Sequence, residues 1–217
     1  MKNIPRIFID ADLSDGITIP VSREVSHYLS RVMRTNGCLV FNNGNEFNAK
    51  LTDDTKGLII GEKTSHIDPS NDVTLMFSPI KHTDDLINMA TQMGISEFLP
   101  VITERTVAHH INWERMQKIA IEASEQSNRN SVPKILSPIK FKDLNLSGVV
   151  FADERAAYGR DTNDTPNTNR ILIGPEGGFS ESEFSALDSA GAIGVGLGKT
   201  ILRAETAAIV ALAKIIK

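Results

Sequence analysis

The sequence predicts an α/β protein with two domains, a small β-rich N-terminal domain and a larger domain built on a mostly parallel sheet. Short strand-like segments separated by turn residues fill the N-terminal part of the chain. A turn-rich stretch, His66-Ile-Asp-Pro-Ser-Asn-Asp72, then interrupts this pattern. After it, apolar strand-like runs alternate with longer amphipathic helices, as in β-α units. We therefore predict domains at 1–68 and 69–217.

The N-terminal domain is predicted to be a small β-barrel with one helix. Residues 22–34 place apolar side chains at helical spacing, and Ser22 is suited to cap that helix. The pair Asn43-Gly44 predicts a tight hairpin turn, because both positions tolerate a positive φ. The predicted strands are 6–10, 38–41, 46–51 and 57–60.

The second domain is predicted from alternating apolar runs and helical patterns. Gly94 is placed to end the first of these helices, Asn112 opens the second, and Ser180 begins the third with a Ser-x-x-Glu capping box. The predicted strands are 73–77, 95–102, 148–152, 170–173 and 193–197. The predicted helices are 84–93, one that begins at Asn112, 180–190 and 204–215. This order implies a mostly parallel sheet covered on both faces.

Composition excludes several classes of protein. The chain has 217 residues, of which 41% are hydrophobic and 23% charged, so we expect a real core rather than disorder. A formal net charge of −4 argues against a protein that coats nucleic acid indiscriminately, although it allows a specific RNA enzyme. The single cysteine, Cys38, permits no internal disulfide, and no zinc pattern is present. We expect no metal, no membrane span or signal peptide, and a cytoplasmic location.

The glycine cluster Gly194-Val-Gly-Leu-Gly198, followed by Lys199-Thr200, invites two interpretations as a nucleotide-binding motif. A P-loop requires its first glycine at the position of Ile193, so the spacing disagrees. A dinucleotide site requires an acidic residue about twenty positions later. Glu205 is the only acidic residue after the cluster and lies too close. Taken alone, the cluster is best explained as a glycine-rich turn between a strand and a helix.

A second loop changes that interpretation. Gly174-Pro-Glu-Gly-Gly178 also lies between a predicted strand and a predicted helix. Its glycines allow a ligand to approach the backbone closely. Because the ends of parallel strands meet at one edge of a sheet, the two loops are expected to form one pocket. Such a pocket, offering mainly peptide groups and apolar side chains, suits an adenine and a ribose better than a polyphosphate.

Together the two loops resemble the bacterial ribosomal RNA small subunit methyltransferase E family, which belongs to the SPOUT methyltransferases. The resemblance is carried by Ile173-Gly-Pro-Glu-Gly-Gly-Phe-Ser180, Gly196-Leu-Gly198 and Ile201-Leu-Arg-Ala-Glu-Thr-Ala207. Further matches cover essentially the whole chain: Pro5–Phe8, Arg31–Arg34, Glu104–Thr106, Glu122–Ser127, Arg129 and Val132-Pro133. The chain departs from the family at Lys199-Thr200, where Pro-Arg is usual, and at Met89 and Gln92, where Lys and Glu are favoured.

The resemblance implies a PUA-like RNA-binding barrel followed by a SPOUT domain with a deep trefoil knot. It also implies a homodimer that uses S-adenosylmethionine to methylate N3 of one uridine in 16S rRNA of the small ribosomal subunit. The predicted cofactor-binding residues are Leu172, Ile173, Gly174, Pro175, Glu176, Gly177, Gly178, Gly196, Leu197, Gly198, Ile201 and Leu202.

N3 of uridine is a poor nucleophile until its proton is lost, so the reaction needs a base or a group that stabilises the anion. Arg203 and Glu205 are the predicted catalytic residues; a phosphate or subunit contact for Arg203, and a helix-terminus role for Glu205, are the alternatives. The predicted RNA-binding residues are Arg6, Arg23, Arg31, Arg34, Gln126 and Arg129.

Two other functions remain open from the sequence. A non-catalytic RNA-binding factor for ribosome assembly would bind RNA without a cofactor. A nucleotide-dependent kinase or triphosphatase would bind ATP.

Overall fold

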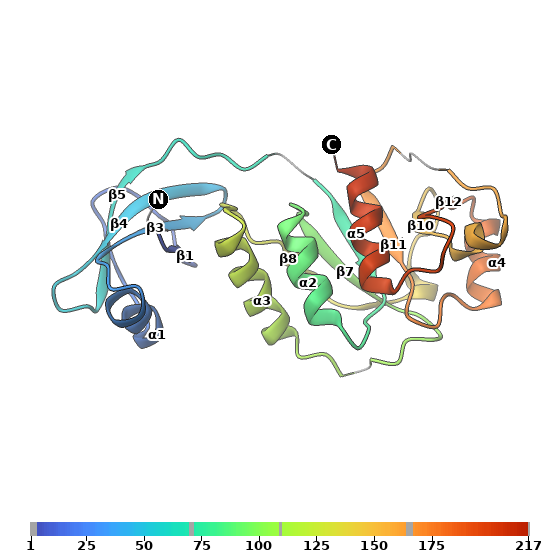
Figure 1. Ribbon diagram of the computed structural model, residues 1–217, viewed down its shortest axis with the longest axis horizontal. Coiled ribbons are helices and arrows are strands. Elements are labelled where there is room, and N and C mark those ends of the chain that lie inside the picture. Colours follow the sequence, from blue (N-terminus) through green and yellow to red (C-terminus); the bar gives the residue numbers. More distant parts are fainter. Residues whose placement is uncertain (1–3, 70–71, 109, 164–166, 217) are drawn as a thin grey trace. The chain divides into compact units, whose positions relative to one another are not determined.

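The computed structural model describes residues 4–69, 72–108, 110–163 and 167–216, and the chain divides into two compact units (Figure 1). One unit combines Met1–Ser70 with Ile121–Val132. The other combines Asn71–Ala120 with Pro133–Lys217. Within the described residues, no helix is long and apolar enough to cross a membrane.

The first unit contains a five-stranded sheet in the order β1-β3-β4-β5-β2. Its strands are β1 (Arg6–Phe8), β2 (Thr18–Pro20), β3 (Gly37–Asn42), β4 (Asn45–Leu51) and β5 (Gly57–Lys63). The predicted hairpin turn is confirmed, because Asn42 pairs with Asn45 and both intervening residues, Asn43 and Gly44, have positive φ. Strand β2 was not predicted.

Cys38 lies in the core of this unit, as predicted. Its side chain is buried among those of Val40, Leu58 and Ile60. Burial raises the pKa of its thiol to about 12, since the thiolate would be poorly solvated there. The thiol therefore acts as a small apolar group at neutral pH.

The predicted helix of this unit is shorter than expected. It comprises α1 (Arg23–His27) and a π-helical turn, η1 (Tyr28–Val32). Ser22 caps it as predicted, because its side chain accepts a hydrogen bond from the backbone N–H of Val25. Arg34 lies beyond the helix at a φ of 51°, so the prediction that it continues the helix is wrong.

Arg6 is a buried hub of the first unit. Its guanidinium donates to Glu46 at 2.9 Å, to the Asn130 side chain at 2.7 Å and to the Arg129 carbonyl at 2.9 Å. It also lies 4.6 Å above the centre of the Phe41 ring. Only 7% of its side chain is exposed. Arg6 therefore holds segment 121–132 against the sheet.

The second unit contains a parallel sheet in the order β12-β10-β11-β6-β7-β8, with β9 also pairing with β7. Its strands are β6 (Thr74–Phe77), β7 (Glu97–Ile102), β8 (Lys134–Ile135), β9 (Ile139–Lys140), β10 (Val150–Ala152), β11 (Arg170–Ile173) and β12 (Ile193–Val195). Strands β8 and β9 were not predicted, since each is only two residues long.

The helices of the chain after residue 70 agree with the prediction. They are α2 (Thr83–Gln92), α3 (Trp113–Gln126), α4 (Glu181–Ser189) and α5 (Ala204–Ile215). Gly94 follows α2 with a φ of 91°, and the Asn112 side chain accepts from the backbone N–H of Arg115 at 3.0 Å. Two short 3₁₀ helices, η2 (Phe141–Asp143) and η3 (Glu154–Tyr158), were not predicted.

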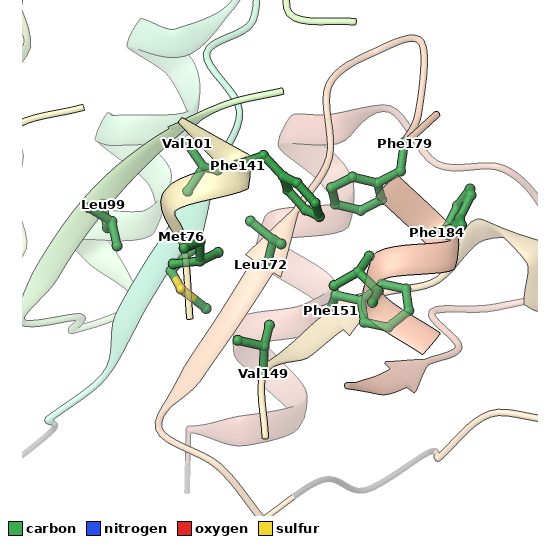
Figure 2. Close-up of a cluster of buried hydrophobic side chains, with 11 residues drawn as sticks. Met76, Leu99, Val101, Phe141, Val149, Phe151, Leu172, Phe179 and Phe184 are labelled. Carbon is green, nitrogen blue, oxygen red and sulfur yellow. The ribbon is translucent and has the colours of Figure 1, made fainter. Parts of the chain in front are cut away.

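Both faces of the parallel sheet are covered, as predicted. On one face, Met76 and Leu172 from the strands meet Phe151, Phe179 and Phe184 (Figure 2). The rings of Phe179 and Phe184 lie 5.6 Å apart in an edge-to-face arrangement. Helix α5 contacts β11, β6 and α2, and Figure 2 places it behind the strands, away from this cluster.

The capping box at the start of α4 is fully formed. The Ser180 hydroxyl accepts from the Glu183 backbone N–H at 3.2 Å, and the Glu183 carboxylate accepts from the Ser180 N–H at 2.9 Å. We expect Ser180→Ala to lower the free energy of unfolding by about 1 kcal/mol, measured by urea denaturation, because a helix N–H loses its acceptor. Ser185→Ala, on the exposed part of the same helix, is the control and should leave stability unchanged or slightly raised. Equal stability for Ser180→Ala and the wild type would contradict this role of the cap.

Candidate functional site

A cavity of about 730 Å³ lies at the carboxyl edge of the parallel sheet. Four stretches of chain line it: Lys81 and His82 after β6, residues within 152–158 from the end of β10 onward, Ile173–Gly178 from the end of β11 onward, and residues within 197–207 in the loop after β12 and the start of α5. All of them belong to the second unit. The two glycine-containing loops therefore meet, as the strand order requires.

The loop after β11 is packed so closely that a side chain at either of two glycines would require its neighbours to move. A Cβ on Gly174 would lie 3.1 Å from the ring of Phe179. Gly178 has a φ of 68°, and a Cβ there would collide with the Glu154 carboxylate. The peptide groups of this loop can therefore come close to a ligand without intervening side chains.

Residues 104–105, which follow β7, form hydrogen bonds that support the loop after β11. The Arg105 guanidinium donates to the Gly177 carbonyl at 2.9 Å and to the Phe179 carbonyl at 3.2 Å. Next to it, the Glu104 carboxylate accepts from the Ser182 hydroxyl at 3.1 Å. Hydrogen bonds from Ser180 and Ser182 hold the pKa of Glu104 below its usual value. Residues 104–105 thus fix the loop before any ligand binds.

The loop before α5 is held by the helix that follows it. The Lys214 ammonium, in the last turn of α5, donates to the Gly196 carbonyl at 2.8 Å. Arg203 is the N-cap residue of α5 and is exposed, while Glu205 lies in the first turn of that helix. Both side chains line the cavity. Lys199 is exposed and is not among the residues that line it.

A network of four charged residues fixes the wall that follows β10. Asp153, whose side chain is fully buried, accepts two hydrogen bonds from Arg155, both at 2.8 Å. Arg155 and Arg160 both also bind Asp188 of α4, the latter at 2.7 Å. The Arg155 guanidinium lies 3.9 Å above the centre of the Phe184 ring. Buried ion pairs need such complete hydrogen bonding to offset the loss of hydration.

A model of the RNA methyltransferase domain family matches residues 68–216. The chain is also 33% identical to the ribosomal RNA small subunit methyltransferase E of Rickettsia conorii, over 97% of this chain and 94% of that protein. The chain belongs to the ribosomal RNA small subunit methyltransferase E family. A second relative, from Mesomycoplasma hyopneumoniae, is 32% identical over 86% of this chain and 88% of its own length.

Solved structures of the methyltransferase E family agree with this assignment. The crystal structure of the enzyme from Neisseria gonorrhoeae, bound to S-adenosyl methionine, is 28% identical and has a TM-score of 0.82. The match covers 97% of this chain and 96% of that one.

Most residues predicted to bind a cofactor in this methyltransferase E chain do line the cavity, but two do not. Leu172 is buried in the core cluster, because alternate residues of a strand point to opposite faces of the sheet. Its side chain is therefore not part of the lining, and a contact of the cofactor with the Leu172 main chain stays a prediction. Gly196 is also absent from the lining, and its carbonyl is occupied by Lys214. The remaining ten are Ile173, Gly174, Pro175, Glu176, Gly177, Gly178, Leu197, Gly198, Ile201 and Leu202.

The sequence prediction missed two parts of the lining, Lys81-His82 and the wall after β10. Both follow parallel strands that end at the same edge, so strand order was the signal that could have found them. The Lys81 N–H donates to the Glu176 carboxylate at 2.8 Å, which joins one missed segment to a predicted loop.

The predicted RNA-binding residues fall into different environments within the first unit. Arg23, Arg31, Arg34 and Gln126 are exposed, and Arg129 is half-buried. Burial lowers the pKa of Arg129. The structure contradicts the prediction that Arg6 binds RNA. Its guanidinium is buried and bonded to protein acceptors, so it does not face RNA. In the part of the chain that the structure describes, no three His, Cys, Asp or Glu side chains are grouped to hold a metal ion.

The charged network predicts a specific dependence of stability on pH. Hydrogen bonds from Arg155, and then from Arg160, hold the pKa of Asp188 below its ordinary value of 3.8. A lowered folded-state pKa means that Asp188 contributes stability above pH 3.8 and loses it as pH falls through the lowered value. We expect Asp188→Asn to reduce the loss of unfolding free energy on acidification below about pH 4, measured by urea denaturation at a series of pH values.

Ser189→Ala, next to Asp188 in α4, serves as the control and should keep the wild-type pH profile. If Asp188→Asn has the same acid profile as the wild type, the network does not contribute to stability in this way.

Proposed function

We propose that this chain transfers a methyl group from S-adenosylmethionine to N3 of a uridine in 16S rRNA of the small ribosomal subunit. The observation that carries the proposal is the cavity in which two glycine-containing loops meet, in a chain that belongs to the ribosomal RNA small subunit methyltransferase E family. The solved family structure bound to S-adenosyl methionine supports the choice of cofactor.

The residues of the cavity fit this cofactor. Its volume of about 730 Å³ lies in the range typical of small-molecule sites. Ile173, Leu197 and Leu202 offer apolar surface for the adenine, and residues 174–178 offer peptide groups for its polar atoms. Carboxylates at Glu176 and Glu205 also line the cavity and suit a positively charged sulfonium. When bound, the cofactor supplies an electrophilic methyl group.

Arg203 and Glu205 are the proposed catalytic residues. Methyl transfer mainly requires donor and acceptor to be held in contact and in line. The uracil N3 must also lose its proton, and the resulting negative charge needs a nearby donor. Arg203 lines the cavity at the exposed start of α5, which supports a role for its guanidinium in stabilising that anion. Glu205, two residues further on, either orients Arg203 or accepts the proton.

The finer features of the fold belong to the same proposal. We propose that residues 1–68 form a PUA-like barrel, with a domain boundary between residues 68 and 69. The first unit, which also includes Ile121–Val132, is proposed to bind RNA through Arg23, Arg31, Arg34, Gln126 and Arg129. We also propose a trefoil knot in the second unit, because the chain belongs to the methyltransferase E family.

The proposed homodimer is supported by exposed apolar side chains at the rim of the cavity. Ile201 is 56% exposed there, and a second copy would remove it from water. Because the substrate is a ribosomal subunit, the proposed place of action is the cytoplasm.

Arg203→Ala should lower kcat by about 100-fold while changing the affinity for S-adenosylhomocysteine by less than about threefold, because the lost donor acts on the transition state. The assay is methylation of small-subunit particles that lack the modification, with the product identified by nucleoside mass spectrometry. Lys199→Ala removes a cation from the same loop but outside the cavity lining and should retain activity. A fully active Arg203→Ala variant would exclude this residue from catalysis.

Calorimetry distinguishes the alternative functions. The proposed enzyme binds S-adenosylhomocysteine and not ATP, and it forms 3-methyluridine in the particle. Binding of ATP alone would indicate a kinase or triphosphatase. Binding of RNA with neither compound would indicate a non-catalytic assembly factor.

A further inference from the structure

We propose that Glu154 is a ligand-binding residue whose carboxylate accepts a hydrogen bond from a ribose hydroxyl of the bound nucleoside. This inference rests on the proposed function, because it takes the ligand of the cavity to be an adenosine derivative. It assigns a role to the wall after β10, which the two glycine-containing loops do not include.

Glu154 lies where the wall meets the loop after β11. It is the first residue of η3 and lines the cavity. Its carboxylate contacts Gly178 so closely that any side chain there would collide with it. The backbone of Phe179 also forms a hydrogen bond with this carboxylate. One side of the carboxylate is therefore directed at the loop after β11.

Glu154 is half-buried, and its carboxylate accepts backbone hydrogen bonds from Phe179 and from its own residue, so acceptor sites remain for a donor from a ligand. Burial raises the pKa of Glu154, and the neighbouring charge of Asp153 raises it further. The nearest arginine does not serve it, because the described hydrogen bonds of the Arg155 side chain go to Asp153 and Asp188. A neutral hydroxyl donor from a ligand in the cavity would supply what the protein does not.

The position of Glu154 along η3 indicates which part of the ligand it meets. Glu154 is the first residue of this 3₁₀ helix. Tyr158 is its last residue and is 82% exposed. Four residues of 3₁₀ helix span about 8 Å. The buried Ile173 and the half-buried Leu202 suit the nucleoside, and the charged methionine tail then lies nearer to the exposed Tyr158. Carboxylates commonly bind ribose hydroxyls in this way.

The charged network around Asp153 fixes the direction of Glu154. Asp153 is the N-cap of η3, and its side chain accepts from the Arg155 N–H at 3.1 Å. Its own N–H donates to the Val195 carbonyl of β12 at 3.0 Å. A second carboxylate therefore anchors the turn that presents Glu154, and Asp153 is a positioning residue for it.

The test combines variants of Glu154 with altered ligands, using calorimetry on the full-length protein. The ligands are 5′-methylthioadenosine, its 2′-deoxy and 3′-deoxy forms, and S-adenosylhomocysteine. We expect the wild type to bind one deoxy form about 10- to 100-fold more weakly than 5′-methylthioadenosine, the range for a hydrogen bond to a charged group. In Glu154→Ala this ratio should fall to within about twofold of unity, and in Glu154→Gln it should be intermediate.

Glu62→Gln, at an exposed glutamate of β5, is the matched control and should keep the wild-type ratio. If Glu154 only supports the loop, its variants weaken all ligands by the same factor and the ratio stays at its wild-type value, which overturns the inference. The inference also fails if the variants change only the preference for S-adenosylhomocysteine over 5′-methylthioadenosine, since that would place Glu154 at the amino-acid tail. A wild type that binds none of these ligands would refute the proposed function itself, and the inference with it.

Discussion

The parallel direction of β6, β10, β11 and β12 is the constraint on which the rest of the site depends. Parallel strands deliver all their following loops to one edge of the sheet, so segments far apart in sequence converge there. The cavity has four contributing segments because four neighbouring strands end beside it. Both glycine-containing loops contribute to the cavity, which explains why the cluster at 194–198, considered alone, resembles an ordinary turn.

Rigid support from outside compensates for the small side chains in these loops. Glycine lets a ligand reach the peptide groups, but it also leaves a loop with few contacts of its own. Here the contacts come from neighbours: Arg105 holds the carbonyls of Gly177 and Phe179, and Lys214 holds the carbonyl of Gly196. Lys199-Thr200 gives the loop before α5 no proline to stiffen it, so the contribution of Lys214 is especially relevant in this chain.

Features that depend on local periodicity were predicted well, and features that depend on distant contacts were not. Ser22, Asn43-Gly44 and the Ser180 capping box signal their own local structure, and the structure confirms them. Arg6 looked like an exposed cation because nothing nearby in sequence announces its partners, Glu46 and Asn130. The burial of the Leu172 side chain follows from the two-residue period of a strand, which the prediction of cofactor-binding residues did not use. Short elements such as η3 carry too few residues to show a period at all.

The hub at Arg6 has a consequence for biosynthesis. Its acceptors include the carbonyl of Arg129 and the side chain of Asn130, which are translated more than a hundred positions after the arginine itself. In an early nascent chain, the Arg6 guanidinium would lack its acceptors at Arg129 and Asn130. Burying a guanidinium with unpaired N–H groups costs free energy. The first unit is therefore completed only after residues up to Val132 have left the ribosome. Although most of its residues precede those of the second unit, it is not an independent early-folding module.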